Sequence, residues 1–176
     1  MLPCYQWDRI ILVPRGHPLT KVPQPIDLAT LAEHPLITYV FSATGESSFK
    51  EAFAAQGLEP QGVFTARDAD IIKTYVRMGM GVGVVASMAF ERADEKDLVA
   101  LEAVGLFPRV TTWLGFRRDS VLRGYMVDFV SLFSPQLTAD RVRRAAALAT
   151  QAEVDALLAD LKLPLRAGGQ APARPG

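Results

Sequence analysis

The sequence predicts an α/β layer fold in which crossover connections link the strands of a mainly parallel sheet. The first observation is that short apolar runs alternate with amphipathic helical stretches in the order β-α-β-α-β-α-β. The second is residues 79–87, where glycines separate a helical stretch from a strand. The third is a globular composition, with 49% hydrophobic and 22% charged residues. A length of 176 residues fits one domain, or a small domain with an extension.

The glycine-rich segment 79–87 predicts a helix-to-strand turn. We expect Gly79 to end the helix in a left-handed conformation. Gly81 and Gly83 would let the new strand pass close to a neighbouring backbone. A dinucleotide-binding loop has the opposite order, strand before helix, and the spacing G-x-G-x-x-G, which this segment lacks. The pattern therefore favours a connection within the sheet over a nucleotide site.

The first part of the chain begins with a strand at residues 9–13, an apolar run closed by a turn rich in proline and glycine. Residues 25–33 have leucines at helical spacing and predict a short helix. A second strand is expected at residues 36–40. The next helix carries Phe49 and Phe53 on one face and ends at Gly57.

In the second part, residues 63–65 predict a short strand, and Asp68 is the expected N-cap of a helix that runs to Met78. Two more strands are expected at residues 98–101 and 110–116. An apolar stripe at helical spacing then predicts a helix at residues 120–133.

The chain changes character after Pro135. Residues 138–149 and 153–161 predict two alanine-rich helices with thin apolar faces. Three arginines in the first of them are read as a solvated helix face rather than a nucleic-acid patch. Residues 164–176 are rich in proline, glycine and alanine, and we expect them to be disordered.

The overall charge favours no polyanionic partner, because 19 basic residues balance 19 acidic ones. The single cysteine, Cys4, cannot form an intrachain disulfide and fits a reducing compartment. No apolar run is long enough to cross a membrane, and the first residues do not have the pattern of a secretory signal. These features predict a cytoplasmic protein without membrane contact.

The most chemically suggestive segment is residues 42–48. Ser42, Thr44, Ser47 and Ser48 place hydroxyl groups around Gly45 at the mouth of a predicted helix. Hydroxyls and N-terminal N–H groups could together cradle a small anion. The alternative is that Thr44 is only the N-cap of that helix. The segment 65–70, with Arg67, offers a second helix mouth of the same kind, and in an α/β sheet both would lie where ligands bind.

Nothing in the sequence indicates an enzyme, a cofactor or a metal site. His17 and His34 are the only histidines, and together with Cys4 they lack the spacing of metal ligands. The serines lie in no nucleophile elbow. The carboxylates of residues 91–97 are expected to do no more than solvate a loop.

Several segments together resemble LysR-type transcriptional regulators. A strand followed by His17-Pro18-Leu19, and the turn 79–87, resemble the family's crossover strand and its helix-to-strand segment. A closer resemblance, to the CysB-like regulators of cysteine biosynthesis, extends to about residue 163. The segments that carry it are residues 1–7, 36–40, 64–77, 111–118 and 122–129.

This resemblance implies an effector-binding domain of the periplasmic-binding-protein type 2 fold, with a small ligand in a cleft between two α/β subdomains. The ligands implied are sulfate, thiosulfate or an acetylserine-like inducer. The family's cleft threonine falls on Thr44, and its functionally sensitive tryptophan falls on Trp7. DNA would be contacted only through an N-terminal helix-turn-helix, and the full-length regulator would be a homo-oligomer.

The expected organisation is a partial effector-binding domain at residues 1–135, with a nearly complete second subdomain at 8–115. A helical extension at 136–163 and the tail at 164–176 follow. Since family members begin with a helix-turn-helix and most of a first subdomain, we expect the chain to be a fragment. It would bind ligand weakly and leave the apolar stripe of residues 120–133 without its partner. A solute-binding or other small-molecule-binding α/β protein is the alternative.

Overall fold

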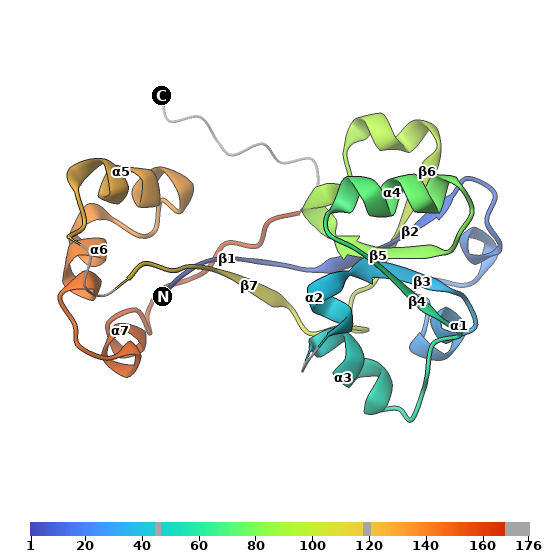
Figure 1. Ribbon diagram of the computed structural model, residues 1–176, viewed down its shortest axis with the longest axis horizontal. Coiled ribbons are helices and arrows are strands. Elements are labelled where there is room, and N and C mark those ends of the chain that lie inside the picture. Colours follow the sequence, from blue (N-terminus) through green and yellow to red (C-terminus); the bar gives the residue numbers. More distant parts are fainter. Residues whose placement is uncertain (45–46, 118–120, 168–176) are drawn as a thin grey trace. The chain divides into compact units, whose positions relative to one another are not determined.

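A computed structural model describes residues 1–44, 47–117 and 121–167 (Figure 1). The chain divides into two compact units. One comprises Met1–Gln6 and Val110–Leu165, and the other comprises Trp7–Arg109 with the residues from Arg166 on. We call them the helical unit and the sheet unit. Within the described residues, no helix is long and apolar enough to cross a membrane.

The sheet unit is built on five strands in the order β4-β3-β5-β2-β6. Their bounds are β2 Arg9–Pro14, β3 Leu36–Tyr39, β4 Val63–Ala66, β5 Val82–Ala86 and β6 Leu98–Glu102. Strand β3 pairs in parallel with β4 and β5, whereas β2 pairs antiparallel with both β5 and β6. The sheet is therefore mixed, because one strand, β2, runs against the other four.

Four strands share one direction, as expected, but the antiparallel β2 inside the sheet was not expected. Strand β2 enters between β5 and β6, which are consecutive in the chain. The connection from β5 to β6 contains two short 3-10 helices, η2 Ser87–Ala89 and η3 Arg92–Lys96. It crosses from one side of β2 to the other, because β2 lies between β5 and β6 in the sheet. Alternation of strands and helices along a sequence does not encode the direction of an inserted strand, so the sequence pattern could not reveal it.

Helices cover both faces of the sheet. Alternate residues of β2 and β5 point to different clusters: Ile11 and Val84 to one, Leu12 and Val85 to the other. The first cluster includes side chains from α1 Leu28–Ala32 and α3 Ser48–Ala54, and the second includes side chains of α4 Ala69–Arg77. A four-residue helix, α2 Val40–Ala43, follows β3 directly, and a 3-10 turn, η1 Pro18–Lys21, follows β2.

The glycine-rich turn has the structure that its sequence predicts. Gly79 has a φ of +73°, in the left-handed region, directly after α4. At Gly81 an added Cβ would lie 2.5 Å from the carbonyl oxygen of Pro35, so the strand does pass close to another backbone. Gly83 differs from the expectation, because its close neighbours are side chains of Val76, Leu12 and Ile72.

Helix caps agree with the sequence in part. The Asp68 carboxylate accepts a hydrogen bond from the Ile71 amide at 2.9 Å, which confirms it as the N-cap of α4. The helix expected at residues 25–33 is shorter, because Asp27 caps it and the first helical residue is Leu28.

The described part of the helical unit holds three helices and a two-stranded sheet, β1 Leu2–Trp7 with β7 Val110–Leu114, in which the last residue of β1 already belongs to the sheet unit. The helices are α5 Gly124–Phe133, α6 Ala139–Ala146 and α7 Gln151–Leu157. The apolar stripe of α5 is divided. Val127 and Val130 are buried, whereas Tyr125, Phe129 and Leu132 are exposed. The two alanine-rich helices form in the expected region but are shorter, since α6 ends at Ala146 and α7 begins at Gln151 and ends at Leu157. The expected tail lies mostly outside the described residues.

Candidate functional site

The carboxyl edge of the sheet collects polar and aromatic side chains. Since β3, β4 and β5 are parallel, their last residues, Tyr39, Ala66 and Ala86, meet at one edge. The antiparallel strand β2 begins at the same edge, with Arg9 opposite Ala86. Ligands of α/β proteins bind outside the carboxyl ends of strands. This edge is therefore the candidate site.

Thr44 is not the N-cap of α3. It follows α2, and its hydroxyl donates to the carbonyl of Val40 at 2.9 Å. Ser47 is the cap, and its Oγ accepts a long hydrogen bond from the Lys50 amide at 3.3 Å. Helix α2 was not expected from the sequence, because its first residues continue the apolar run of the preceding strand. Thr44 is exposed, with a hydroxyl bonded back to its own helical turn.

Ser42 and Ser47 are joined. The Ser47 hydroxyl donates to the carbonyl oxygen of Ser42, which links α2 to the start of α3. Ser42 itself is buried, and its own Oγ has no hydrogen-bond partner within the described part of the chain. A buried hydroxyl without a partner is costly, so this atom is available to a ligand or a water molecule. Gly45, the glycine expected in this cradle, lies outside the described residues.

Trp7 is buried at the same edge beside Arg9. The Cζ atom of Arg9 lies 5.8 Å from the Trp7 ring centroid and 5.5 Å from that of Phe107. These distances are typical of cation-π contacts. Nη1 of Arg9 also donates to the Pro108 carbonyl at 3.5 Å. Burial lowers the pKa of Arg9, while the nearby Tyr39 hydroxyl acts in the opposite direction.

Tyr39 completes the edge. Its hydroxyl oxygen accepts a hydrogen bond from the Ala86 amide at 3.3 Å, and its ring stacks on Phe41 at 4.8 Å. Burial raises the pKa of Tyr39, although the Ala86 hydrogen bond and the Arg9 charge lower it in part. Sequence reasoning missed both Tyr39 and Arg9. The one signal for Arg9 was a basic residue at the first position of an apolar strand.

The second helix mouth does not form an anion site. At the start of α4 the Asp68 carboxylate already accepts the Ile71 amide, and Asp70 lies one turn from Lys73 with its carboxylate 3.1 Å from Nζ. Arg67 is exposed. The negative charges of Asp68 and Asp70 at the start of α4 would repel an anion, so this helix start is unsuited to an anion site.

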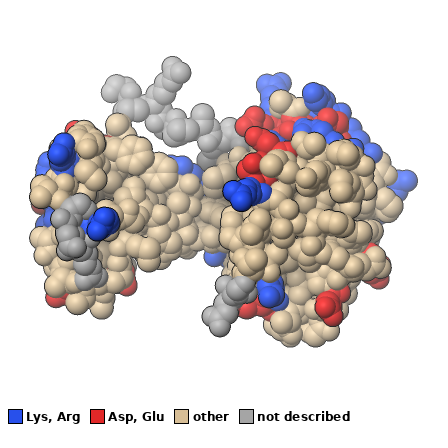
Figure 2. Space-filling model, in the orientation of Figure 1, with Lys and Arg blue, Asp and Glu red and all other residues tan. Residues whose placement is uncertain are grey.

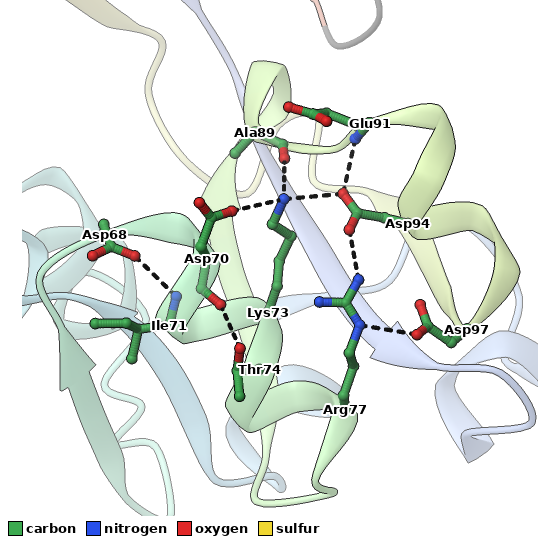
Figure 3. Close-up of polar contacts among 10 residues, drawn as sticks. All are labelled: Asp68, Asp70, Ile71, Lys73, Thr74, Arg77, Ala89, Glu91, Asp94 and Asp97. Atoms are coloured by element: carbon green, nitrogen blue, oxygen red, sulfur yellow. Dashed lines mark hydrogen bonds and ion pairs between the residues drawn. The ribbon is translucent and has the colours of Figure 1, made fainter.

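The acidic segment after β5 is not simply solvated, which corrects the sequence interpretation. Asp94 is buried, with Oδ2 3.1 Å from Lys73 Nζ and Oδ1 2.6 Å from Arg77 Nη2 (Figure 3). Lys73 also donates to the Ala89 carbonyl at 3.2 Å, and Asp97 accepts from Arg77 at 3.0 Å. Figure 2 shows acidic and basic side chains gathered over this region. The network ties α4 to η3 through these ion pairs, although the buried Oδ1 atom of Asp97 has no hydrogen-bond partner within the described residues.

The histidines form a pair without a third metal ligand. The rings of His17 and His34 meet edge to face at 5.2 Å, and Nδ1 of His17 accepts the Leu19 amide. Burial, followed by the charge of His34, lowers the pKa of His17. No group of three His, Cys, Asp or Glu side chains suited to a metal occurs in the part of the chain that the structure describes.

A hollow of about 670 Å³ lies beside the candidate edge rather than on it. Its walls come from α3 and from residues 58–63, and it includes Ser47 but neither Ser42 nor Thr44. Its size fits a small molecule. Its lining is largely apolar, so the polar groups of the edge are the better indication of where a charged ligand binds.

Comparison with known proteins decides the family, since the family described as "LysR substrate binding domain" matches residues 1–138. The chain belongs to this family. Members of the LysR substrate-binding domain family have the periplasmic-binding-protein-like type 2 fold, and the mixed α/β structure matches it. The expected resemblance is confirmed.

Named relatives of this LysR domain are transcriptional regulators. The chain is 44% identical over 162 residues to the HTH-type transcriptional regulator CysB of Haemophilus influenzae, covering 92% of this chain and 50% of that protein. It is 44% identical over 135 residues to the regulator SsuR of Burkholderia cenocepacia, covering 77% of this chain and 44% of SsuR. The chain therefore spans about half the length of these relatives.

A solved structure supports the same assignment. The crystal structure of the cofactor-binding domain of the Cbl transcriptional regulator matches with a TM-score of 0.76 and 37% identity, over 84% of this chain and 64% of that domain. The chain thus has the structure of a LysR-type effector-binding domain and is related to CysB, Cbl and SsuR.

Proposed function

We propose that this chain is the effector-sensing part of a LysR-type regulator of sulfur and cysteine metabolism. It binds a small anion such as sulfate or thiosulfate, or an acetylserine-like inducer, and performs no catalytic step. Similarity to CysB and SsuR at 44% identity supports the regulatory class. In the complete regulator the ligand lies in a cleft between two subdomains, residues 8–115 form most of one of them, and residues 136–163 are a helical extension.

The observation that carries the proposal is the polar edge of the sheet. Ser42 presents a buried hydroxyl that has no partner within the described residues, the Ser47 hydroxyl donates to the Ser42 carbonyl, and Thr44 directly follows α2. Trp7 and Arg9 lie at the same edge. A ligand with several oxygen atoms supplies the acceptors and donors that such a set requires.

DNA binding resides outside this chain in the proposal. Basic and acidic residues are equal in number, and the arginines of α6 are partly neutralised: Arg141 pairs with Asp160 at 2.7 Å and Arg144 lies 3.7 Å from Asp140. The complete regulator acts in the cytoplasm as a homo-oligomer and contacts DNA through a helix-turn-helix.

Calorimetric titration tests the function. The chain is titrated with sodium sulfate, sodium thiosulfate and O-acetylserine, with sodium chloride at equal ionic strength as the control. We expect saturable heats with at least one of the three ligands and none with chloride. The absence of saturable binding to all three, repeated in a regulator that includes the DNA-binding region, would refute the proposal.

A further inference from the structure

Arg9 is a buried cation, and only 6% of its surface is exposed. It is the first residue of β2 and lies opposite Ala86 of β5, at the carboxyl edge of the sheet. Its guanidinium lies near the rings of Trp7 and Phe107 and donates one long hydrogen bond to the Pro108 carbonyl. Phe107 is fixed in turn, because its ring stacks on Phe49 of α3 at 5.5 Å. The guanidinium is therefore held in place by rigid, apolar surroundings.

No negative charge on the described part of the chain balances this cation. None of its Asp or Glu side chains forms an ion pair with Arg9. Asp8, the adjacent acidic residue, instead pairs with Arg109 at 3.1 Å. Other buried charges of the sheet unit are treated differently, since Lys73 has two carboxylate partners. A buried charge that lacks a partner is unfavourable, and proteins keep such a group where a ligand supplies the missing charge.

A second donor lies at the same edge. The Tyr39 oxygen already accepts the Ala86 amide, so the hydroxyl hydrogen is left to donate, and it has no acceptor within the described residues. Ala86 is the residue opposite Arg9 in the sheet register. The two side chains pack on different faces of the sheet, however, because Tyr39 lies against the cluster of α4 whereas Arg9 contacts Phe107 of the cluster of α1 and α3.

We propose that Arg9 binds the negatively charged group of the effector, a carboxylate or a tetrahedral oxyanion. This inference rests on the proposed effector-binding function and adds the residue that selects anionic over neutral ligands. The planar fork of an arginine matches two oxygen atoms of a carboxylate or a sulfate. Trp7 acts as a positioning residue, because its ring holds the Arg9 guanidinium in place. The N–H groups of Arg9 that do not bond Pro108 are left for the ligand.

The alternative is that Arg9 has only a structural role, in packing against the rings at the edge of the sheet. The two roles predict different effects of an Arg9 substitution on the stability of the ligand-free protein. If Arg9 is an unpaired cation that waits for a ligand, replacing it by an apolar side chain of similar length removes an unfavourable charge. If the ring contacts of Arg9 support the fold, the same replacement weakens the fold. Stability without ligand and affinity for ligand must therefore be measured in the same variants.

The variants are Arg9→Met, Arg9→Lys and the control Arg143→Met, which makes the same change of charge on the exposed side of α6. Thermal unfolding in sodium chloride reports stability, and titration with sodium sulfate and with O-acetylserine at equal ionic strength reports affinity. We expect Arg9→Met to keep or raise the unfolding midpoint and to lose at least tenfold in affinity for the bound ligand. Arg9→Lys keeps the charge but not the fork, so we expect a smaller loss, and Arg143→Met should bind as the wild type does.

The two ligands separate the two anion chemistries, because a loss for sulfate alone identifies an oxyanion site and a loss for O-acetylserine alone identifies a carboxylate site. Unchanged affinity in Arg9→Met would overturn the inference while leaving the proposed function intact. If Arg9→Met does not fold, wild-type affinity in Arg9→Lys together with a lowered midpoint would identify a packing role and overturn it as well. A wild-type chain that binds neither ligand would instead count against the proposed function itself.

Discussion

Lys73 and Asp94 form an ion pair at 3.1 Å in which both side chains are buried. Lys73 belongs to α4 and Asp94 to η3, so the pair joins two elements that are separated by strand β5. Arg77 adds a second contact to the same carboxylate (Figure 3). The turn that leads from β5 to β6 is thereby fixed against the helix that precedes β5.

Asp94→Asn should destabilise the sheet unit by about 3 kcal/mol, because it removes one charge of a buried pair and leaves Lys73 with only an exposed partner. Urea unfolding monitored by circular dichroism measures the change. The matched control is Asp160→Asn, which breaks a pair with Arg141 in which Asp160 is exposed, and we expect it to cost less than about 1 kcal/mol. Equal costs for the two variants would show that burial of the Asp94 pair has no energetic role.

Acid should weaken the same contact. Burial alone would raise the pKa of Asp94, but hydrogen bonds from the Glu91 amide, Arg77 and Lys73 outweigh it and hold the pKa below its usual value. A lowered folded-state pKa gives stabilisation that is complete above the unfolded-state value of about 3.9 and is lost as the pH falls through the folded-state value. The free energy of unfolding should therefore decline below about pH 4, and less steeply in Asp94→Asn than in the wild type. Parallel slopes would exclude Asp94 from the acid response.

Gly81→Ala should destabilise the protein by about 2 kcal/mol, because the new methyl group would meet the Pro35 carbonyl oxygen and the connection must shift. Gly62→Ala is the control, since a Cβ at Gly62 meets nothing within 4 Å. Thermal unfolding of the two variants and the wild type measures the difference, and we expect the lower midpoint in Gly81→Ala. A lower midpoint in the control than in Gly81→Ala would contradict the steric argument.

Thr44→Val tests the hydroxyl that the family resemblance assigns to the effector. The change keeps the shape of the side chain, and we expect a loss of about 1–3 kcal/mol in affinity for the bound ligand, the scale of one unmade hydrogen bond. Thr44→Ser should lose much less. Because the Thr44 hydroxyl also bonds the Val40 carbonyl, unfolding midpoints must be compared alongside the titrations. Wild-type affinity in Thr44→Val would restrict Thr44 to capping α2.

Local features of the fold could be predicted from the sequence. Asp68 caps α4 and Gly79 ends the turn after it, because both roles depend on neighbours within a few residues. The partners of Asp94, by contrast, lie 17 and 21 residues away in the chain. A local pattern shows four carboxylates in the loop at residues 91–97 and cannot show which of them the fold buries.

The candidate site was predicted in the same partial way. Ser42, Thr44 and Ser47 are a visible cluster of hydroxyls, but the N-cap of α3 is Ser47 and not Thr44, because α2 continues an apolar strand pattern. Arg9 and Tyr39 lie at the same end of the sheet only because β2 is inserted beside β5, with Arg9 opposite Ala86. That register is a property of the sheet, so it could not be read from either segment alone.

The ion pair between Asp8 and Arg109 has a topological consequence. Asp8 follows the point where the chain enters the sheet unit, and Arg109 is the residue at which the chain leaves it, and the two side chains lie 3.1 Å apart. The segment Trp7–Arg109 of this unit thus begins and ends at one place. Insertions or deletions in its inner loops, such as residues 58–62, leave the spacing of those ends unchanged. Evolution can therefore reshape the ligand edge without lengthening or shortening the strands that lead out of it.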